Sequence, residues 1–425
     1  MDKSEVLRML TDDRYYTIED LRYNRKLGFM FSKEQLADFL LCKDELVDNV
    51  EDVEKEYDLE GKINIFKKLP LKTFNSKHCF YIGNSLLLSI ASEYIQIQIE
   101  DHASNHSWLF HRNLEDLIIS RLFSEVEGTL NIENIPTTHK RIAEISRADT
   151  VTEKNDIIIK NMLNAITFIV EEEPAFNRDN LRKLYQILSK ESLEPELQLK
   201  DGSYYRNDAV YVGDYEGADY RIVDECMESM FSFANDEESI RKHRIFLPFI
   251  CHYYILYIHP YFDYNGRTAR MVSFWLNYLY NTSVAPYFIS EAINESKGDY
   301  YRAIVNTRDA HNDLTYFLRY ILETSIKYSF VYKNLEEMRK ELSKTGDSLS
   351  STEWVYVKKI LIHNTENYFN YKEFLGYINA TMTRQGALKI LNNLTEYGIL
   401  EKTQNRKGDT IFRLNPNCVT YQYHS

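Results

Sequence analysis

Residues 258–270 concentrate side chains that could carry out a reaction, in the order Ile-His-Pro-Tyr-Phe-Asp-Tyr-Asn-Gly-Arg-Thr-Ala-Arg. The segment contains one imidazole, one carboxylate, a flexible pair and two guanidinium groups, namely His259, Asp263, Asn265-Gly266, Arg267 and Arg270. Such a set can bind an anion, place a metal ion beside it and remove a proton. The spacing predicts transfer of a phosphoryl or nucleotidyl group to a hydroxyl.

Each of these residues has physical properties that suit it to one part of such a reaction. Asn265 and Gly266 can present backbone N–H groups at the start of a helix, which is an anion-binding arrangement. Arg267 and Arg270 are three residues apart and would face the same anion from the first helical turn. Asp263 offers the hard oxygen ligand that Mg²⁺ takes beside phosphate. His259, with an ordinary pKa of about 6.5, can act as a general base.

This segment resembles the signature of the Fic (filamentation induced by cAMP) family, H-P-F-x-D/E-G-N-G-R-x-x-R. Tyr261 stands at the phenylalanine position, and Tyr264 stands where the family usually has glycine. The similarity extends over residues 69–324 and includes the hairpin described below. A tyrosine at position 264 restricts φ, so it either crowds the α-phosphate or turns away from it.

The resemblance implies a role for each position. His259 would be the general base and Asp263 would hold Mg²⁺ on the α- and β-phosphates of ATP. The residues expected to contact the nucleotide are Asn265, Gly266, Arg267, Arg270 and Tyr301, with Arg270 on the γ-phosphate. The reaction would leave AMP on a tyrosine, threonine or serine of a target protein, or of the chain itself, and release pyrophosphate.

The segment around Glu127-Gly128 resembles the inhibitory motif of the same family, S/T-x-x-x-E-G/N, although Phe123 fills the Ser/Thr position. A glutamate near a helix C-terminus gains from a cationic partner. The resemblance supplies that partner as Arg270, and a salt bridge would withdraw Arg270 from ATP. We therefore expect an inhibitory helix over about 113–128. The alternative is an ordinary helix that ends at a glycine.

Residues 204–223 differ from the helical patterns around them. Val210, Tyr211 and Val212 favour a strand, and the glycines that follow favour a turn, which predicts a hairpin. In the resembled family this hairpin is the flap that docks the target segment by strand addition. His252 is expected to be a packed histidine and not a ligand.

Composition favours a mainly α-helical protein, because only 14 glycines and 8 prolines occur among 425 residues. We expect an N-terminal helical region (1–75), a Fic-type helical core with the flap hairpin (76–342), a linker (343–351) and a winged helix-turn-helix domain (352–425). Five scattered cysteines and the absence of a signal peptide or a long apolar run predict a cytoplasmic protein without a membrane partner. The oligomeric state stays open, a homodimer included.

The net charge of −13 argues against nucleic-acid binding by the whole chain, but residues 352–414 carry nine basic and six acidic residues. The winged helix is therefore expected to bind either DNA or a protein. Two alternatives to the adenylyltransferase remain. One is a DNA-binding regulator whose catalytically weak core senses a nucleotide. The other is an enzyme that removes AMP or transfers another phosphate-linked group.

Overall fold

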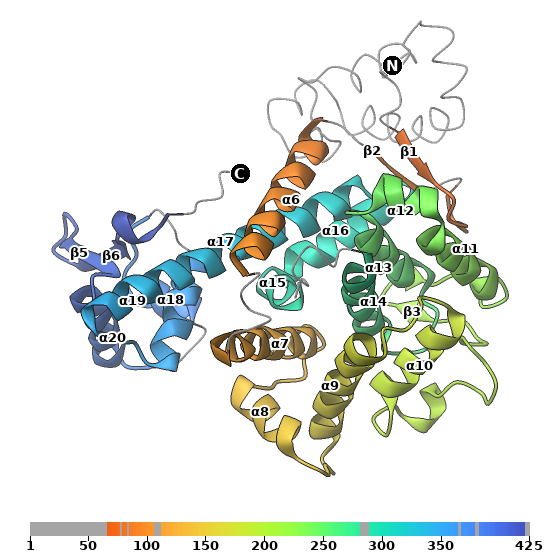
Figure 1. Cartoon of the computed structure of the whole chain (residues 1–425), viewed down its shortest axis with the longest axis horizontal. Coiled ribbons are helices and arrows are strands. Elements are labelled where there is room, and N and C mark those ends of the chain that lie inside the picture. The colour runs from red at the N-terminus through yellow and green to blue at the C-terminus, as the bar shows by residue number, and fades with distance from the viewer. Residues whose placement is uncertain are drawn as a thin grey trace, which may run out of the picture. The chain divides into compact units, whose positions relative to one another are not determined.

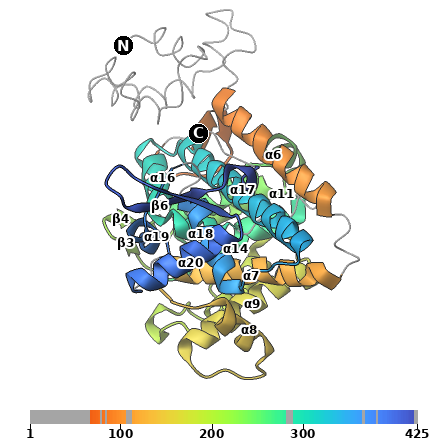
Figure 2. The same cartoon turned by 90° about the vertical axis from the view of Figure 1, so that its left-hand side faces the viewer.

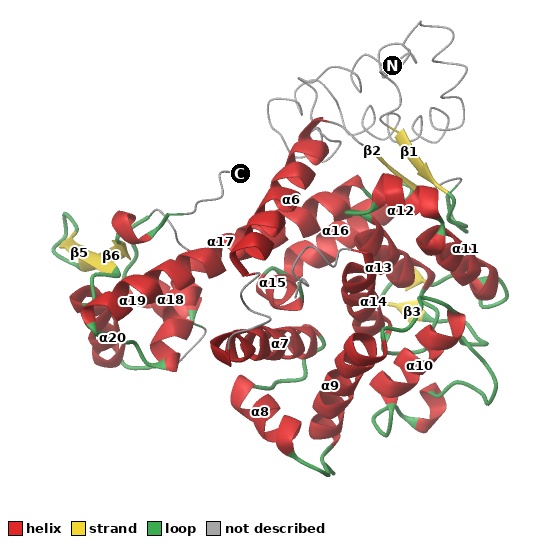
Figure 3. Ribbon diagram, viewed as in Figure 1, coloured by secondary structure: helices red, strands yellow, loops and turns green. Residues whose placement is uncertain are grey.

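The computed structural model describes residues 66–76, 79–82, 85–105, 112–280, 289–363, 367–378 and 382–420. The described residues are predominantly helical, as the low glycine and proline content predicts (Figures 1 and 3). They divide into two compact units between Thr324 and Ser325. No helix within these ranges combines the length and the apolar character that a membrane span requires.

The helices of the first unit are α6 (Ser85–Asn105), α7 (Arg112–Ile132), α8 (His139–Arg147), α9 (Lys154–Glu172), α10 (Arg178–Ser189), α11 (Val223–Asn235), α12 (Glu237–His243), α13 (Leu247–Ile258), α14 (Asn265–Tyr280), α15 (Ser290–Glu295), α16 (Lys297–Asp309) and the start of α17 (Thr315–Thr345). A short 3₁₀ turn, Pro195–Leu197, follows α10. In both Figure 1 and Figure 2, α8 and α9 lie below α7.

The two buried helices α13 and α14 form the centre of this unit. Nearly every side chain of α13 is buried, and so are the first three turns of α14. An all-round apolar helix must be enclosed by other helices. Pro260 stops α13 from continuing, and the chain returns as α14 after a short loop. Residues 258–270 are the end of α13, this loop and the start of α14, so two buried helices fix their position.

Two small hairpins complete the first unit. Strands β1 (Phe66–Leu69) and β2 (Cys79–Ile82) pair antiparallel, with Phe66 opposite Ile82 and Leu69 opposite Cys79. The prediction of helix up to residue 75 is therefore wrong for β1, because a partner strand ten residues away decides its conformation. Residues 1–65 of the predicted helical region lie outside the described residues. Strands β3 (Tyr211–Val212) and β4 (Tyr215–Glu216) form the predicted hairpin within 204–223.

The second unit contains the rest of α17 and then α18 (Ser351–His363), α19 (Tyr371–Tyr377), α20 (Arg384–Glu396), β5 (Leu400–Gln404), β6 (Thr410–Leu414) and a 3₁₀ turn, Pro416–Cys418. The helices and the hairpin appear in the order that the sequence predicts. Strands β5 and β6 pair antiparallel with Leu400 opposite Leu414. The connection between α17 and α18 is 346–350, shorter than the predicted linker because α17 continues to Thr345.

Candidate active site

The loop between α13 and α14 is held by two left-handed residues and one asparagine. His259 has φ +56 and Tyr264 has φ +68, and together they turn the chain at the two ends of the loop. The Asn265 side chain accepts a hydrogen bond from the Tyr261 backbone N–H (3.0 Å) and donates one to the Tyr261 carbonyl (2.8 Å). Asn265 was predicted to contact phosphate; its side chain instead closes the loop, and its place at the start of α14 leaves its backbone for an anion.

His259 lies at the C-terminal end of α13 with its ring partly enclosed. Burial, which outweighs the other influences on this ring, lowers the pKa of His259 to about 4. The backbone of Leu256 and the carboxylate of Asp263 act in the opposite direction, favouring the protonated form. The imidazole is therefore neutral at pH 7 and can accept a proton, as a general base must.

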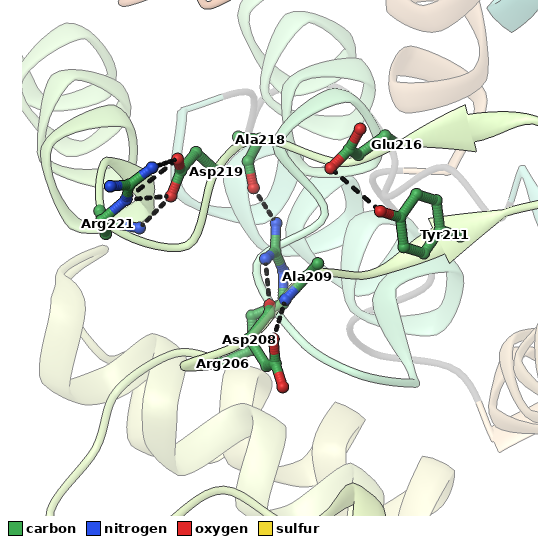
Figure 4. A network of polar contacts seen from close by, with 8 residues as sticks. All are labelled: Arg206, Asp208, Ala209, Tyr211, Glu216, Ala218, Asp219 and Arg221. Carbon is green, nitrogen blue, oxygen red and sulfur yellow. Dashed lines mark hydrogen bonds and ion pairs between the residues drawn. The ribbon is translucent and has the colours of Figure 1, made fainter.

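Arg206, one of the hairpin residues that resemble the Fic core but to which the sequence analysis assigned no role, fixes the backbone on both sides of His259. Its Nε donates to the His259 carbonyl at 2.7 Å, and its Nη2 donates to the carbonyl of Ala218 and, at 3.5 Å, to that of Ile258. Figure 4 shows this guanidinium between Ala218 and Asp208, apart from the exposed Arg221–Asp219 pair. Burial lowers the pKa of Arg206. The buried guanidinium thus joins the flap to the loop.

The flap itself is exposed. Tyr211 and Val212 are 64% and 50% exposed, although both side chains have large apolar surfaces. Val210 precedes β3, and its carbonyl accepts a hydrogen bond from Gly217 N–H at 3.0 Å. A Cβ at Gly217 would lie 3.1 Å from the Cβ of His259, so the base of the flap passes directly over the candidate base.

Asp263 and Arg267 lie on either side of Tyr264. The Asp263 side chain is 49% exposed, and its Oδ1 accepts from Tyr264 N–H at 2.6 Å and lies 3.7 Å from Nη2 of Arg267. Within the described ranges no group of three or more His, Cys, Asp or Glu residues is arranged to hold a metal ion. A single exposed carboxylate beside an anion site fits Mg²⁺ that arrives with phosphate oxygens, which typically supply the remaining ligands.

Arg267 and Arg270 occupy the first turns of α14 and are both buried. Arg267 Nε and Nη1 have no hydrogen-bond partner among the described residues. A buried guanidinium is costly unless it is paired, so these two N–H donors are suited to a phosphate. Gly266, between the asparagine and Arg267, leaves room for close approach, because a Cβ there would lie 2.6 Å from Oε1 of Glu133.

Arg270 is paired with residues at the end of α7. Its Nε donates to Thr129 Oγ1 at 2.7 Å, and its Nη2 lies 2.6 Å from Oε1 of Glu133. The prediction that Glu127 pairs with Arg270 is therefore wrong. Burial alone would raise the pKa of Glu133, but the Arg270 guanidinium outweighs it and holds this pKa below its ordinary value. Glu133 is a carboxylate in contact with Arg270 and Gly266, where an anion would bind.

Glu127 and Gly128 have other places in the fold. Glu127 Oε2 lies 3.2 Å from Nε2 of His139 on α8. Gly128 is inside α7 and does not end it, and a Cβ there would lie 2.5 Å from the backbone N of Glu291. Gly128 was predicted to belong to the inhibitory motif; it instead permits α7 and α15 to pack closely.

The sequence analysis missed a second match to the inhibitory motif, which lies at the C-terminal end of α7. Thr129, Glu133 and Asn134 have the S/T-x-x-x-E-G/N spacing without a mismatch. Asn134 has φ +59, the left-handed conformation that commonly ends a helix. Four residues before the motif, Glu125 is buried, and its carboxylate accepts hydrogen bonds from Ser290 N–H (2.7 Å) and from the Ser290 hydroxyl. Burial raises the pKa of Glu125 to about 7.

The remaining predicted residues lie on α13 and α16. His252 is buried, and its Nε2 forms a hydrogen bond of 2.9 Å with the Tyr300 hydroxyl, so it is a packed histidine as expected. Tyr301 is 45% exposed. Burial raises its pKa, Glu133 adds to this, and Arg270 opposes it.

The fold and the loop together define a helical domain with a neutral histidine, an exposed carboxylate and buried arginines on one anion site. Comparison with known proteins identifies the domain: residues 175–276 match the family model "Fic/DOC family", so the chain carries a Fic domain. This segment includes the flap, α13, the loop and the first turns of α14. The resemblance stated from the loop residues is confirmed.

Two further comparisons agree with this assignment. The chain is 32% identical over 122 residues to "Protein adenylyltransferase fic-1" of Caenorhabditis briggsae, and that stretch is 28% of this chain and 22% of the relative. It is 26% identical over 132 residues to "Protein adenylyltransferase Fic" of Drosophila ananassae, covering 31% and 25%. The chain thus spans about a quarter of the length of these curated relatives.

A solved structure shows the same fold. A Fic family protein from Desulfovibrio desulfuricans G20 has a TM-score of 0.50 and 17% sequence identity, with 79% of this chain and 98% of that chain covered. At this identity the similarity concerns the arrangement of helices and not the reaction. The predicted mainly α, Fic-type fold is confirmed.

Proposed function

We propose that the chain is a protein adenylyltransferase that transfers AMP from ATP to a hydroxyl of a protein, itself included. The observation that carries this proposal is the geometry of the loop. A neutral, half-enclosed His259 stands at one end of this loop, and Arg267, whose buried Nε and Nη1 have no hydrogen-bond partner among the described residues, stands at the other. The names of the two curated relatives support the same activity.

The proposed reaction is an in-line displacement at the α-phosphorus of ATP. The target hydroxyl loses its proton to the imidazole of His259, and its oxygen forms a bond to the α-phosphorus. The bond between that phosphorus and the bridging oxygen to the β-phosphorus breaks, and pyrophosphate leaves with the electron pair. The backbone N–H groups at the start of α14 and the Arg267 guanidinium hold the phosphates in line.

Asp263 is the residue that would hold Mg²⁺. When bound, the ion supplies neutralisation of phosphate charge and shields the developing negative charge on pyrophosphate. The contact between Asp263 Oδ1 and the Tyr264 N–H fixes the orientation of the carboxylate, and the side chain as a whole is 49% exposed.

We further propose that Glu133 inhibits the reaction in cis. Its carboxylate lies against both Gly266 and Arg270, so it occupies the position that a phosphate oxygen would take. A carboxylate and a phosphate cannot share that position without strong repulsion. Release of Glu133 would free Arg270 for the γ-phosphate, next to Tyr301.

The flap is the proposed docking edge for the target. In the part of the chain that the structure describes, strand β3 pairs with β4 on one side only, so its other edge can pair with an extended peptide, as in β-strand addition. Val210, Tyr211 and Val212 would set the register of the target hydroxyl relative to His259.

Intact-protein mass spectrometry after incubation with Mg-ATP tests this function. We expect wild type to gain little mass, Glu133→Gly to gain the mass of AMP, and Glu133→Gly combined with His259→Ala to gain none. Glu127→Gly is the matched control, since Glu127 lies six residues earlier, on α7, but pairs with His139. A gain of a phosphate or another group in Glu133→Gly would assign a different transfer to the site.

We also propose a second function for the unit after Thr324, DNA binding by a winged helix. Phe369, just before α19, forms an isolated β-bridge with Phe412 of β6 through two backbone hydrogen bonds (2.7 and 2.8 Å), which joins the chain before α19 to the wing. Arg384, Gln385 and Lys389 are exposed on α20. They are residue types that contact phosphates and base edges when a helix enters the major groove.

The turn between β5 and β6 supports the same function, because it exposes Arg406 and Lys407. A gel shift with duplex DNA that weakens with salt, and weakens further in Arg384→Ala, would support DNA binding. Retention of a protein and not of DNA would assign this unit to protein interaction, and a DNA shift without AMP transfer in Glu133→Gly would favour the regulator.

The state of the cysteines is an indication of the cellular compartment in which the chain is found. Cys79, Cys226, Cys251 and Cys418 are free thiols, and the first three are buried. Free thiols are typical of reducing compartments. This supports our proposal of a cytoplasmic location, which fractionation of cells that express the chain would test.

A further inference from the structure

Tyr264 departs from the usual Fic signature and yet has a glycine-like backbone. Its φ is +68, in the left-handed region that disfavours a side chain with a Cβ. The side chain is only 3% exposed. A large residue at an unfavourable backbone angle persists only when its surroundings hold it there, so the contacts of this ring are informative.

The ring of Tyr264 is fixed at both ends. Its hydroxyl lies 2.6 Å from Ser192 Oγ, in the loop after α10. Ser192 is buried and lies 3.5 Å from Nδ2 of Asn161, which also donates to the carbonyl of Lys190 at 2.7 Å. The tyrosine is therefore anchored to a segment that other side chains already hold.

The face of the same ring supports Arg267. The guanidinium carbon lies 3.3 Å from the ring centroid, which is a close cation–π contact. Stacking uses the plane of the guanidinium and leaves its edge N–H groups available. Two of them, Nε and Nη1, are buried without a partner among the described residues, while Nη2 lies 3.7 Å from Asp263 Oδ1.

We propose that Tyr264 is a positioning residue for Arg267. Its ring, anchored by Ser192, holds the guanidinium plane so that Nε and Nη1 face the phosphates of the nucleotide. In this chain the aromatic platform replaces the free backbone that a glycine would give, and it turns away from the phosphate site instead of crowding it. The inference rests on the proposed function, because the anion that Arg267 meets is taken to be ATP.

Two substitutions separate the ring face from the hydroxyl and from burial. Tyr264→Phe keeps the π face and loses only the bond to Ser192. Tyr264→Leu keeps an apolar side chain with the same left-handed backbone cost and loses the π face. Mg-ATP binding is measured by calorimetry on the full chain carrying Glu133→Gly and His259→Ala, which is uninhibited and cannot turn over. We expect Tyr264→Phe to bind within about twofold of its parent and Tyr264→Leu about tenfold more weakly.

A double-mutant cycle identifies Arg267 as the group through which the ring acts. In chains that also carry Arg267→Met, Tyr264→Phe and Tyr264→Leu should bind Mg-ATP with the same affinity. Equal affinities in Tyr264→Phe and Tyr264→Leu, or a loss that persists in Arg267→Met, would overturn the proposal. Kinetics in Glu133→Gly should show the same loss for Tyr264→Leu mainly as a raised KM for ATP.

The failure of the proposed function would be visible separately. If the uninhibited parent binds no Mg-ATP, adenylyl transfer fails, and thermal unfolding of the same cycle decides the role of Tyr264. The unfolding midpoint of Tyr264→Leu should then lie further below that of Tyr264→Phe when Arg267 is present than when the chain also carries Arg267→Met. Equal falls would leave the ring as packing alone and would overturn the inference.

Discussion

Nη2 of Arg270 lies 2.6 Å from Oε1 of Glu133, and Nε of the same guanidinium donates to Thr129 Oγ1 at 2.7 Å. A buried arginine near the start of α14 is therefore held by one side chain from the last turn of α7 and one from the residue that follows the helix. Arg270 and Glu133 are 137 residues apart in the sequence. Any movement of the α7 terminus changes what Arg270 can bind, so control of the proposed reaction depends on this helix end.

Thr129→Val should release the brake in part. It removes the hydroxyl that accepts from Arg270 Nε but leaves Glu133 in place, and a hydrogen bond to a charged group contributes roughly 1.5–3 kcal/mol. We expect self-modification in the mass-spectrometric assay to rise about 3- to 10-fold above wild type and to stay below Glu133→Gly. Ser124→Ala, on the same helix, is the control. A Thr129→Val rate equal to that of wild type would show that Glu133 alone holds Arg270.

The pH dependence of the rate should lack the inflection of an ordinary histidine. Burial lowers the pKa of His259 to about 4, so the base form is already complete at pH 6. In Glu133→Gly, kcat/KM for a target peptide reports the free enzyme and should change by less than about twofold between pH 6 and 8. A sigmoidal rise centred near 6.5 would contradict the buried geometry.

The lowered pKa of His259 also makes the stability of the chain depend on pH. Between pH 4 and about 6.5 the folded chain binds fewer protons at His259 than the unfolded chain does, so its contribution to stability rises with pH in this window. Above pH 6.5 the contribution is constant. His259→Asn should therefore flatten the rise of the unfolding midpoint between pH 4.5 and 6.5.

The loop could be predicted because its chemistry is local. His259, Asp263 and Arg270 lie within twelve consecutive residues, and the turn between two helices brings them together without any distant partner. Asn265 shows the limit of this reasoning. Its side chain meets the backbone of Tyr261 inside the loop, a contact that residue types alone do not reveal.

The distant partners could not be predicted from local pattern. A glycine usually ends a helix, so Gly128 placed the expected end of α7 too early and drew attention to Glu127. Packing against α15 overrides that tendency, because the helix needs a residue without a Cβ at this contact. The role of Arg206 in holding the loop was missed for a similar reason, since its partners include His259, 53 residues away.

Arg206→Met should cost both stability and activity. The substitution leaves the main-chain carbonyls of His259, Asp208 and Ala218 without their donor, and loss of the partner of the buried Ala218 carbonyl alone costs about 1–3 kcal/mol. We expect a clear fall in the thermal unfolding midpoint and, in Glu133→Gly, loss of most self-modification because the His259 backbone loosens.

Arg221→Met is the matched control for this change. Arg221 lies in the same region, but its side chain is 73% exposed and it bonds to Asp219. Its loss should alter stability by no more than about 0.5 kcal/mol. If both variants unfold at the wild-type temperature, Arg206 does not hold the loop.

Gly128→Ala should destabilise the chain and weaken the brake together. A Cβ at this position would lie 2.5 Å from the backbone N of Glu291, and backbone atoms cannot yield as a flexible side chain can. Forcing α7 away from α15 should cost about 1–3 kcal/mol and displace the helix end that carries Glu133. Thermal unfolding and the mass-spectrometric assay measure the two effects.

Gly298→Ala separates crowding from helix propensity. Gly298 lies in α16, where the nearest side-chain atom to an added Cβ is 4.0 Å away. Alanine favours the interior of a helix over glycine by roughly 0.5–1 kcal/mol, and Gly298 is the second residue of α16, so this variant should be at least as stable as wild type. Gly128→Ala removes a glycine from a helix in the same way, and only the contact with α15 gives it the opposite sign. A stabilised Gly128→Ala with unchanged self-modification would show that α7 can move on α15 without disturbing the Glu133–Arg270 pair.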